Sequence, residues 1–236
     1  MVDVLIINLI LFILIILQSI AGVGILVIGT PTFLILNYSL AEIMSLLLPI
    51  SIITSALNIF FLKFYEKNTF VKINNDYLLL FFGMCIPSVF VGLYLLNIFE
   101  NKLNFEYMVV GVIFITFIIS RSQKYGKNIL KKANSIFLIL VGIVHGLTNS
   151  GGSLLSLLIS QQQNKLQSRF MISFFYFFLA FFQFILFLFI FRDKIILEKY
   201  FPIIIFIPLG VIFGNMLAKH FNEVNYKFLV SSLAMI

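Results

Sequence analysis

Charge is scarce in this sequence. Asp, Glu, Lys and Arg make up only 11% of its 236 residues, whereas a soluble domain has about 25%. Apolar residues make up 61%, more than a soluble chain of this length could bury. The composition therefore excludes a soluble enzyme or a soluble binding domain. Because the apolar runs are continuous and do not alternate with polar residues, we expect an all-α integral membrane protein, a polytopic helical bundle, rather than a β-barrel.

Signals of several other protein classes are absent. The single cysteine, Cys85, excludes an intrachain disulfide and a cysteine-bound metal cluster. Only Asp3 and no Lys or Arg precedes the first apolar run, so this run lacks the basic region of a signal peptide and should remain a membrane segment. The apolar runs contain no acidic pair, no metal-ligand cluster and no phosphate loop. We therefore expect no enzyme and no cofactor. No ATP-hydrolysing motif is present either, so any transport would be secondary or facilitated unless a separate subunit supplies the energy.

The apolar runs predict seven or eight membrane spans. The first run is interrupted by Gly22, Gly24, Gly29, Thr30 and Pro31. It predicts a span over 4–21, then a loosened stretch and a short helical piece that ends at Leu36. The last run, 226–236, is too short to cross alone. The other spans are expected over residues 39–62, 77–97, 105–120, 135–159, 170–191 and 200–218.

Loop charges predict the orientation in the membrane. The net charge of +7 indicates a membrane protein and not a nucleic-acid-binding surface, because the basic residues cluster in loops. If every run crosses once, 11 Lys and Arg collect on one side of the membrane and 5 on the other. The side richer in Lys and Arg is cytoplasmic, so we expect both termini in the cytoplasm of a multi-pass protein of the cell inner (cytoplasmic) membrane. A re-entrant segment at a broken helix would change this parity.

One apolar segment, 135–159, carries polar residues in its middle. Two adjacent glycines weaken a helix, and a broken helix survives within a bilayer only where it faces protein or a water-filled cavity. We therefore predict a discontinuous helix that lines a binding site. The alternative is close helix packing through small residues, which leaves the imidazole and the amide unexplained. The candidate substrate-binding residues of this segment are His145, Thr148, Asn149, Ser150, Gly151, Gly152 and Ser153.

His145 has two interpretations. An ionisable residue deep in a span is a functional candidate by default, and an imidazole can carry a proton or add positive charge beside an anion. The alternative is a neutral histidine packed in the bundle and hydrogen-bonded to a carbonyl. Arg169 likewise has two, an anion-steering residue or, as we favour, an anchor whose charged end reaches the membrane interface.

The two halves of the chain repeat one order of features. Each has a broken helix, a helix, a loop and two further helices, which divides a single transmembrane domain, 1–236, into repeat one over 4–120, a basic cytoplasmic loop over 121–134 and repeat two over 135–236. Breaks at matching positions in two halves indicate the central site of a transporter. The first break lacks polar side chains, so a simple kink remains the alternative there. If the halves differ, the second binds and the first moves. The further site candidates are Gly22, Gly24, Thr30, Pro31, Ser45 and Ser173.

These motifs resemble those of the sulfite exporter TauE/SafE permeases. Gly22-Val23-Gly24, with Pro31 nine residues after Gly22, resembles the first glycine-rich run of that family, and Ser45 stands at its hydroxyl position. The run 146–153 resembles the second, although Asn149 and Ser153 replace glycines. In the remaining departures from the family pattern, Ile25, Leu26 and Leu158 take the places of two glycines and a proline. The resemblance implies movement of sulfite or small organosulfur anions across the cytoplasmic membrane.

The residues themselves suit an anion or a small polar solute as the transported species. The amides at the start of a half-helix attract negative charge, glycines permit close approach, and neutral hydroxyl and amide donors bind loosely enough to release. The expected partners are a small anion, the lipid bilayer and a coupling proton or cation, and homodimerisation through the Phe-rich span 170–191 stays open. Two rivals remain, a facilitated pathway for a neutral small solute and a non-transporting membrane subunit.

Overall fold

The computed structural model describes residues 4–65, 73, 75–99, 134–194 and 202–234, with the single residues 107, 110, 111 and 114. Every regular element in this part of the chain is helical, which confirms the predicted all-helical class. The expected span over 105–120 and the basic loop fall almost entirely outside the described residues. The α-helices are α1 (Val4–Ala21), α2 (Ile25–Ile35), α3 (Leu40–Tyr65), α4 (Asn75–Leu80), α5 (Ile86–Phe99), α8 (Asn134–Thr148), α9 (Gly152–Gln162), α10 (Lys165–Ile190), α11 (Pro202–Ala218) and α12 (Glu223–Leu233), with a π-helical turn at Phe81–Cys85 and a 3-10 turn at Arg192–Lys194.

Four stretches of helix are long and apolar enough to cross a membrane: Val4–Ala21, Leu40–Phe64, Asn75–Phe99 and Lys165–Ile190. Three shorter apolar helices accompany them, over Ile25–Ile35, Ser135–Thr148 and Ile205–Ala218. The outer face of α11 is apolar and exposed, as a lipid-facing surface must be. Its exposed side chains are Ile205, Phe206, Leu209, Ile212, Phe213, Met216 and Leu217.

The break in the first run lies where it was predicted but is shorter. Helix α1 ends at Ala21 and α2 begins at Ile25, so Gly29 and Pro31 lie inside α2 and the expectation that they interrupt the helix is wrong. Gly29 serves packing instead, since a Cβ there would stand 2.7 Å from a methyl group of Leu47. Proline removes one helical hydrogen bond, and the helix continues through it.

Helix α10 begins five residues before the expected start of its span. Asn164 explains this early start, because its side chain accepts a hydrogen bond from the Gln167 amide at 2.9 Å and caps the helix. The polar stretch after α9 is therefore almost entirely helical. At the start of α3, the Glu42 carboxylate accepts from the Ser39 amide at 2.9 Å and the Ser39 hydroxyl oxygen accepts from the Glu42 amide at 3.4 Å, which closes a capping box.

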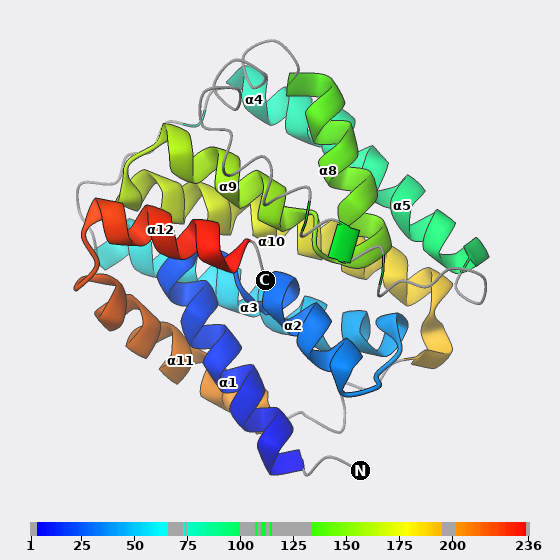
Figure 1. The fold of residues 1–236 in the computed structure, drawn as a ribbon, viewed down its shortest axis with the longest axis horizontal. Helices are drawn as coiled ribbons and strands as arrows, with labels where there is room; N and C mark the ends of the chain where they lie inside the picture. Colours follow the sequence, from blue (N-terminus) through cyan, green and yellow to red (C-terminus); the bar gives the residue numbers. More distant parts are fainter. Residues whose placement is uncertain are drawn as a thin grey trace.

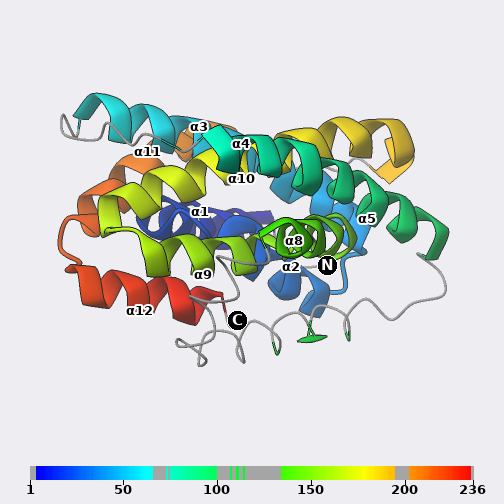
Figure 2. The ribbon, with the colours of Figure 1, turned by 90° about the horizontal axis from the view of Figure 1, so that it is seen from above.

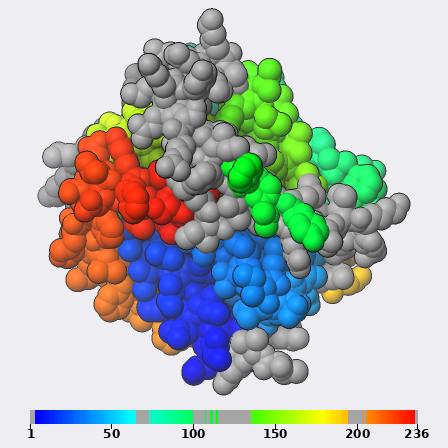
Figure 3. Space-filling view, viewed as in Figure 1, coloured from blue at the N-terminus to red at the C-terminus, as the bar shows by residue number. Residues whose placement is uncertain are grey.

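Helices α3 and α10 form the centre of the bundle. Met44 of α3 lies beside Gln183 of α10, and Asn58 lies beside Ser173, so the two helices run antiparallel. The pair α1–α11 packs on one side of this centre and the pair α5–α8 on the other (Figure 1). Seen from above, α1, α2, α8 and α9 form a layer beneath α3 and α10, with α12 outside it (Figure 2). In Figure 3, α12, α1 and α2 share one face of the molecule.

Glycines allow the two helices within each outer pair, α5–α8 and α1–α11, to pack closely. A Cβ on Gly146 of α8 would overlap the Val89 carbonyl of α5 and approach the Leu93 amide to 2.7 Å. On the other side, a Cβ on Gly214 of α11 would meet the Ser19 side chain of α1 at 2.5 Å. Small residues that let two helical backbones touch are typical of membrane interfaces. Helix packing is therefore the role of Gly146, while the residues just after it form the second break.

Candidate functional site

The two helix breaks have the same backbone ending. At the first, the Gly22 amide donates to the Gln18 carbonyl at 2.7 Å, and Gly22 has a φ of 82°. At the second, the Asn149 amide donates to the His145 carbonyl at 2.8 Å, and Asn149 has a φ of 63°. Glycine and asparagine are the residues that tolerate this left-handed conformation. Gln18 and His145 therefore occupy equivalent positions, one turn before each break.

The first break is closed by Gln18. Its side-chain oxygen accepts from the Ile25 amide at 3.2 Å, which caps the start of α2. Its side-chain nitrogen donates to the Ser51 and Ser55 hydroxyl oxygens at 3.2 and 3.0 Å. The amide group of Gln18 is therefore fully engaged within the protein.

Arg169 also binds the first break, and the prediction that it is an interface anchor is wrong. Its side chain is only 1% exposed. Its guanidinium donates to the carbonyl oxygens of Ile20 at 3.0 Å and Ser19 at 2.9 Å, and to the Asn215 side-chain oxygen at 2.6 Å. The last carbonyls of α1 lack helical partners and carry the negative end of the helix dipole. These carbonyls stabilise the Arg169 cation in the protein interior, whereas the sequence pattern predicted that it lies at the membrane surface.

Three further residues complete this arrangement. The Asn58 amide nitrogen donates to the Gln18 carbonyl at 3.3 Å, and the Asn215 nitrogen donates to the Asn58 side-chain oxygen at 2.8 Å. The Tyr226 hydroxyl of α12 donates to the Ala21 carbonyl at 3.0 Å. The expectation that the first break lacks polar side chains is therefore wrong, because helices α3, α10, α11 and α12 supply them.

The second break is built differently from its prediction. The left-handed residue is Asn149, whereas Gly151 has an ordinary helical φ of −59°. The two glycines provide space: a Cβ on Gly151 would stand 2.5 Å from the His145 amide nitrogen, and one on Gly152 would overlap the Tyr176 hydroxyl. The predicted interruption of the helix is confirmed, but the glycines permit close approach rather than the turn itself.

Four polar side chains meet at the second break, and all are fully buried: His145, Asn149, Tyr176 and Gln183. The His145 carbonyl accepts from the Gln183 side-chain nitrogen at 3.3 Å as well as from the Asn149 amide. The Asn149 side-chain nitrogen donates to the Thr30 hydroxyl oxygen at 3.2 Å, which connects α2 to this break. The rings of His145 and Tyr176 lie with their centroids 6.5 Å apart. The sites at the two breaks thus differ in their donors and acceptors.

Several polar atoms at the second break have no hydrogen-bond partner among the described residues. They are both ring nitrogens of His145, the Asn149 and Gln183 side-chain oxygens, and the Tyr176 hydroxyl. The alternative in which a carbonyl holds the His145 ring is therefore not observed. Leaving one buried polar group unsatisfied costs about 1–3 kcal/mol. Buried groups of this kind in native proteins are commonly satisfied by ordered water, an ion or a bound ligand.

The hydroxyl candidates bond to nearby backbone. Thr148 donates to the Val144 carbonyl at 2.8 Å, Ser150 to the Thr148 carbonyl at 3.1 Å and Ser153 to the Ser150 carbonyl at 2.8 Å. Such local bonds are usual at helix ends. Ser45 similarly donates to the Glu42 carbonyl at 2.8 Å.

The remaining candidates divide between the breaks. Gly22 and Gly24 form the first break, and Ser173 lies there too, where its hydroxyl oxygen accepts from Asn58 at 3.4 Å. Thr30 belongs to the second break through Asn149. Pro31 lies within α2.

Sequence reasoning missed the side chains that distinguish the two breaks. Each is an amide or a hydroxyl within a long apolar run, and polar residues inside membrane segments are rare and commonly functional. That signal was available, but it does not show which side chains meet. The missed residues are Gln18, Asn58, Tyr176, Gln183 and Asn215.

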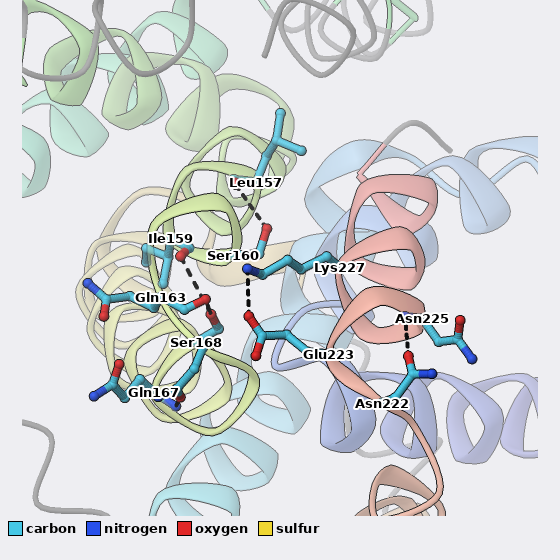
Figure 4. Close-up of polar contacts among 11 residues, drawn as sticks. Leu157, Ile159, Ser160, Gln163, Gln167, Ser168, Asn222, Glu223, Asn225 and Lys227 are labelled. Atoms are coloured by element: carbon cyan, nitrogen blue, oxygen red, sulfur yellow. Dashed lines mark hydrogen bonds and ion pairs between the residues drawn. The ribbon is translucent and has the colours of Figure 1, made fainter. Parts of the chain in front are cut away.

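Helix α9, which starts at the second break, is fixed at its other end (Figure 4). The Ser168 hydroxyl of α10 donates to the Gln163 carbonyl at 3.4 Å. Lys165 of α10 donates to the Phe221 carbonyl at 2.7 Å, which links α10 to the segment before α12. Helix α12 packs against α9 and is itself stabilised by an ion pair of 2.8 Å between Lys227 and Glu223. These contacts fix the C-terminal end of α9 against α10 and α12.

Comparison with known proteins identifies one family. Residues 7–236 match the family described as sulfite exporter TauE/SafE, which is essentially the whole chain. No curated protein and no solved structure matches the chain.

Proposed function

We propose that this chain, which belongs to the sulfite exporter TauE/SafE family, binds a small oxyanion at the second helix break and carries it across the membrane. The family is one of membrane transporters rather than enzymes, and the apolar helices fit a multi-pass membrane protein. The observation that carries the proposal is the group of buried, unpartnered polar atoms on His145, Asn149, Tyr176 and Gln183. The first break has no such set among the described residues.

The chemistry of the second break suits an anion that must later leave. The Tyr176 hydroxyl and one His145 ring nitrogen can donate to anionic oxygens, and α9 begins at Gly152 with its positive dipole end at the break. Glycines at 151 and 152 let Tyr176 and His145 lie directly against that end. Neutral donors hold an oxyanion less tightly than a fixed buried cation would. Weak, reversible binding is what a carrier requires.

An inverted two-repeat architecture is part of the proposal. Gln18 and His145 hold equivalent places before breaks of the same geometry, and α3 and α10 run antiparallel at the centre. Each first helix, α1 or α8, packs against a helix from the other half. These relations are those expected when two repeats face opposite sides of a membrane. The central position of the breaks would let either side reach the site in turn.

The same proposal includes the expected location and coupling. The protein would lie in the inner membrane with both termini on the cytoplasmic side, which is the side richer in basic residues. Transport would be secondary, coupled to a proton or another cation, with His145 as the group on which a proton would reside. The first break would stay fixed during transport, because its carbonyls and amides are densely hydrogen-bonded. This differs from the sequence-based expectation that the first break moves.

The test is uptake of radiolabelled sulfite by purified protein in liposomes under an imposed pH gradient. Asn149→Gly removes the side-chain amide but keeps a residue that accepts a positive φ. Asn37→Gly is the matched control, since Asn37 is exposed and has a φ of 64°. We expect saturable flux that Asn149→Gly abolishes and Asn37→Gly retains.

Each other outcome has a definite reading. Wild-type flux from Asn149→Gly would remove the second break as the site. Competition by acetate but not by sulfonates would move the substrate to carboxylates. Flux of glycerol alone would establish the neutral-solute pathway, and no flux of any solute from folded protein would establish the non-transporting subunit.

A further inference from the structure

We infer that the second break selects anions that carry their own hydrogen-bond donor, such as hydrogen sulfite or a hydroxysulfonate, over anions that present only acceptors. This inference rests on the proposed function and specifies the substrate class of the same site. It follows from the acceptors at the break, which an acceptor-only oxyanion leaves unsatisfied.

The orientation of the Gln183 amide is fixed by its neighbours. Its nitrogen donates to the His145 carbonyl at 3.3 Å, and a carbonyl can only accept. The same nitrogen contacts the Met44 sulfur at 3.7 Å, which uses its second hydrogen. The Gln183 side-chain oxygen therefore remains as a pure acceptor, fully buried and without a partner among the described residues.

Asn149 presents a second acceptor at the same place. Its side-chain nitrogen donates to the Thr30 hydroxyl oxygen at 3.2 Å, and its side-chain oxygen has no partner in the described part of the chain. The backbone amide of Asn149 and the side-chain nitrogen of Gln183 both donate to one atom, the His145 carbonyl oxygen. The two unpartnered oxygens thus belong to residues that converge on a single point of the second break.

The donors at the break complete a mixed set. Tyr176 supplies one hydroxyl hydrogen, and a neutral imidazole at His145 supplies one N–H and one further acceptor. An oxyanion with no hydrogen, such as sulfate, can satisfy the donors but brings its oxygens against the two amide oxygens. An anion that also bears a hydroxyl can satisfy both kinds of group. Sites that contain buried partners for a substrate hydroxyl reject analogues that lack it.

A matched pair of sulfonates tests this inference. Isethionate and ethanesulfonate have the same charge and the same carbon chain, and differ by one hydroxyl. Each is added as a competitor of radiolabelled sulfite uptake, and each is titrated onto purified protein while thermal unfolding is followed. We expect isethionate to act at a concentration lower by about 10- to 100-fold, the cost of one buried acceptor left unsatisfied.

The variant Gln183→Met removes the amide oxygen at similar side-chain volume and should reduce this preference toward unity in the unfolding titration. The control is Gln162→Met, at an exposed position at the end of α9, which should retain it. Equal action of the two sulfonates on the wild type would overturn the inference while leaving sulfite transport intact. An unchanged preference in folded Gln183→Met would also overturn it. Absence of sulfite flux altogether would instead refute the proposed function. The wild-type comparison decides the matter even if Gln183→Met does not fold.

Discussion

The arginine at the first break provides a direct test of how the structure is held together. Arg169→Met replaces the guanidinium by a long unbranched apolar side chain. It removes the donors to the Ile20 carbonyl and the Asn215 side-chain oxygen. Each buried acceptor left without a partner costs about 1–3 kcal/mol. Removing the buried charge offsets part of this cost, but breaking one side of a buried polar arrangement is destabilising on balance. We expect a loss of at least about 2 kcal/mol of unfolding free energy.

The measurement uses the only cysteine in the chain. Cys85 is buried, so a thiol-reactive fluorophore reports its exposure as the protein unfolds in detergent. At about 2–4 °C per kcal/mol for a chain of this size, Arg169→Met should lower the Tm by about 4–8 °C. Arg192→Met is the matched control, because Arg192 is exposed, and its Tm should equal that of the wild type.

A second substitution separates charge from geometry. Arg169→Lys keeps the positive charge, but a single ammonium nitrogen cannot reproduce the separate bonds from Nε and Nη2. We expect its Tm to fall between those of the wild type and Arg169→Met. If Arg169→Met unfolds at the wild-type temperature, the hydrogen bonds of the first break contribute nothing measurable and the reasoning about α1 fails.

Two further predictions concern helix packing and proton coupling. Gly146→Ala should lower the Tm because its Cβ would overlap the Val89 carbonyl, whereas Gly83→Ala should not, since no atom lies within 4 Å of its Cβ; equal Tm values for both variants would contradict close packing of α5 and α8. Protonated His145 would present a second donor and a positive charge to an anion, so flux of radiolabelled isethionate, whose own charge does not change near neutral pH, should rise as the pH is lowered. His145→Gln should abolish this dependence, and a pH profile that survives the substitution would remove the proton role.

Much of the helical architecture follows from the order of residues alone. Long apolar runs with little charge cannot fold as a soluble domain. The two interruptions fall at Gly22 and Asn149, whose left-handed backbone conformation has no place in a regular α-helix. The end of α1 at Ala21 was predictable for this reason. The positions of Gly29 and Pro31 inside α2 were not, because packing against neighbouring helices outweighs local preference.

The chemistry of the two breaks was decided by tertiary structure. The sequence identified His145 and Asn149 as unusual, since a polar residue is conspicuous in an apolar run. It could not show that Gln18 is saturated with hydrogen bonds while His145, at the equivalent place, is not. Nor could it show that Arg169 meets the end of α1, 149 residues away. Hydrogen bonding depends on which helices lie side by side, and that arrangement is fixed by packing over the whole chain rather than by any local pattern.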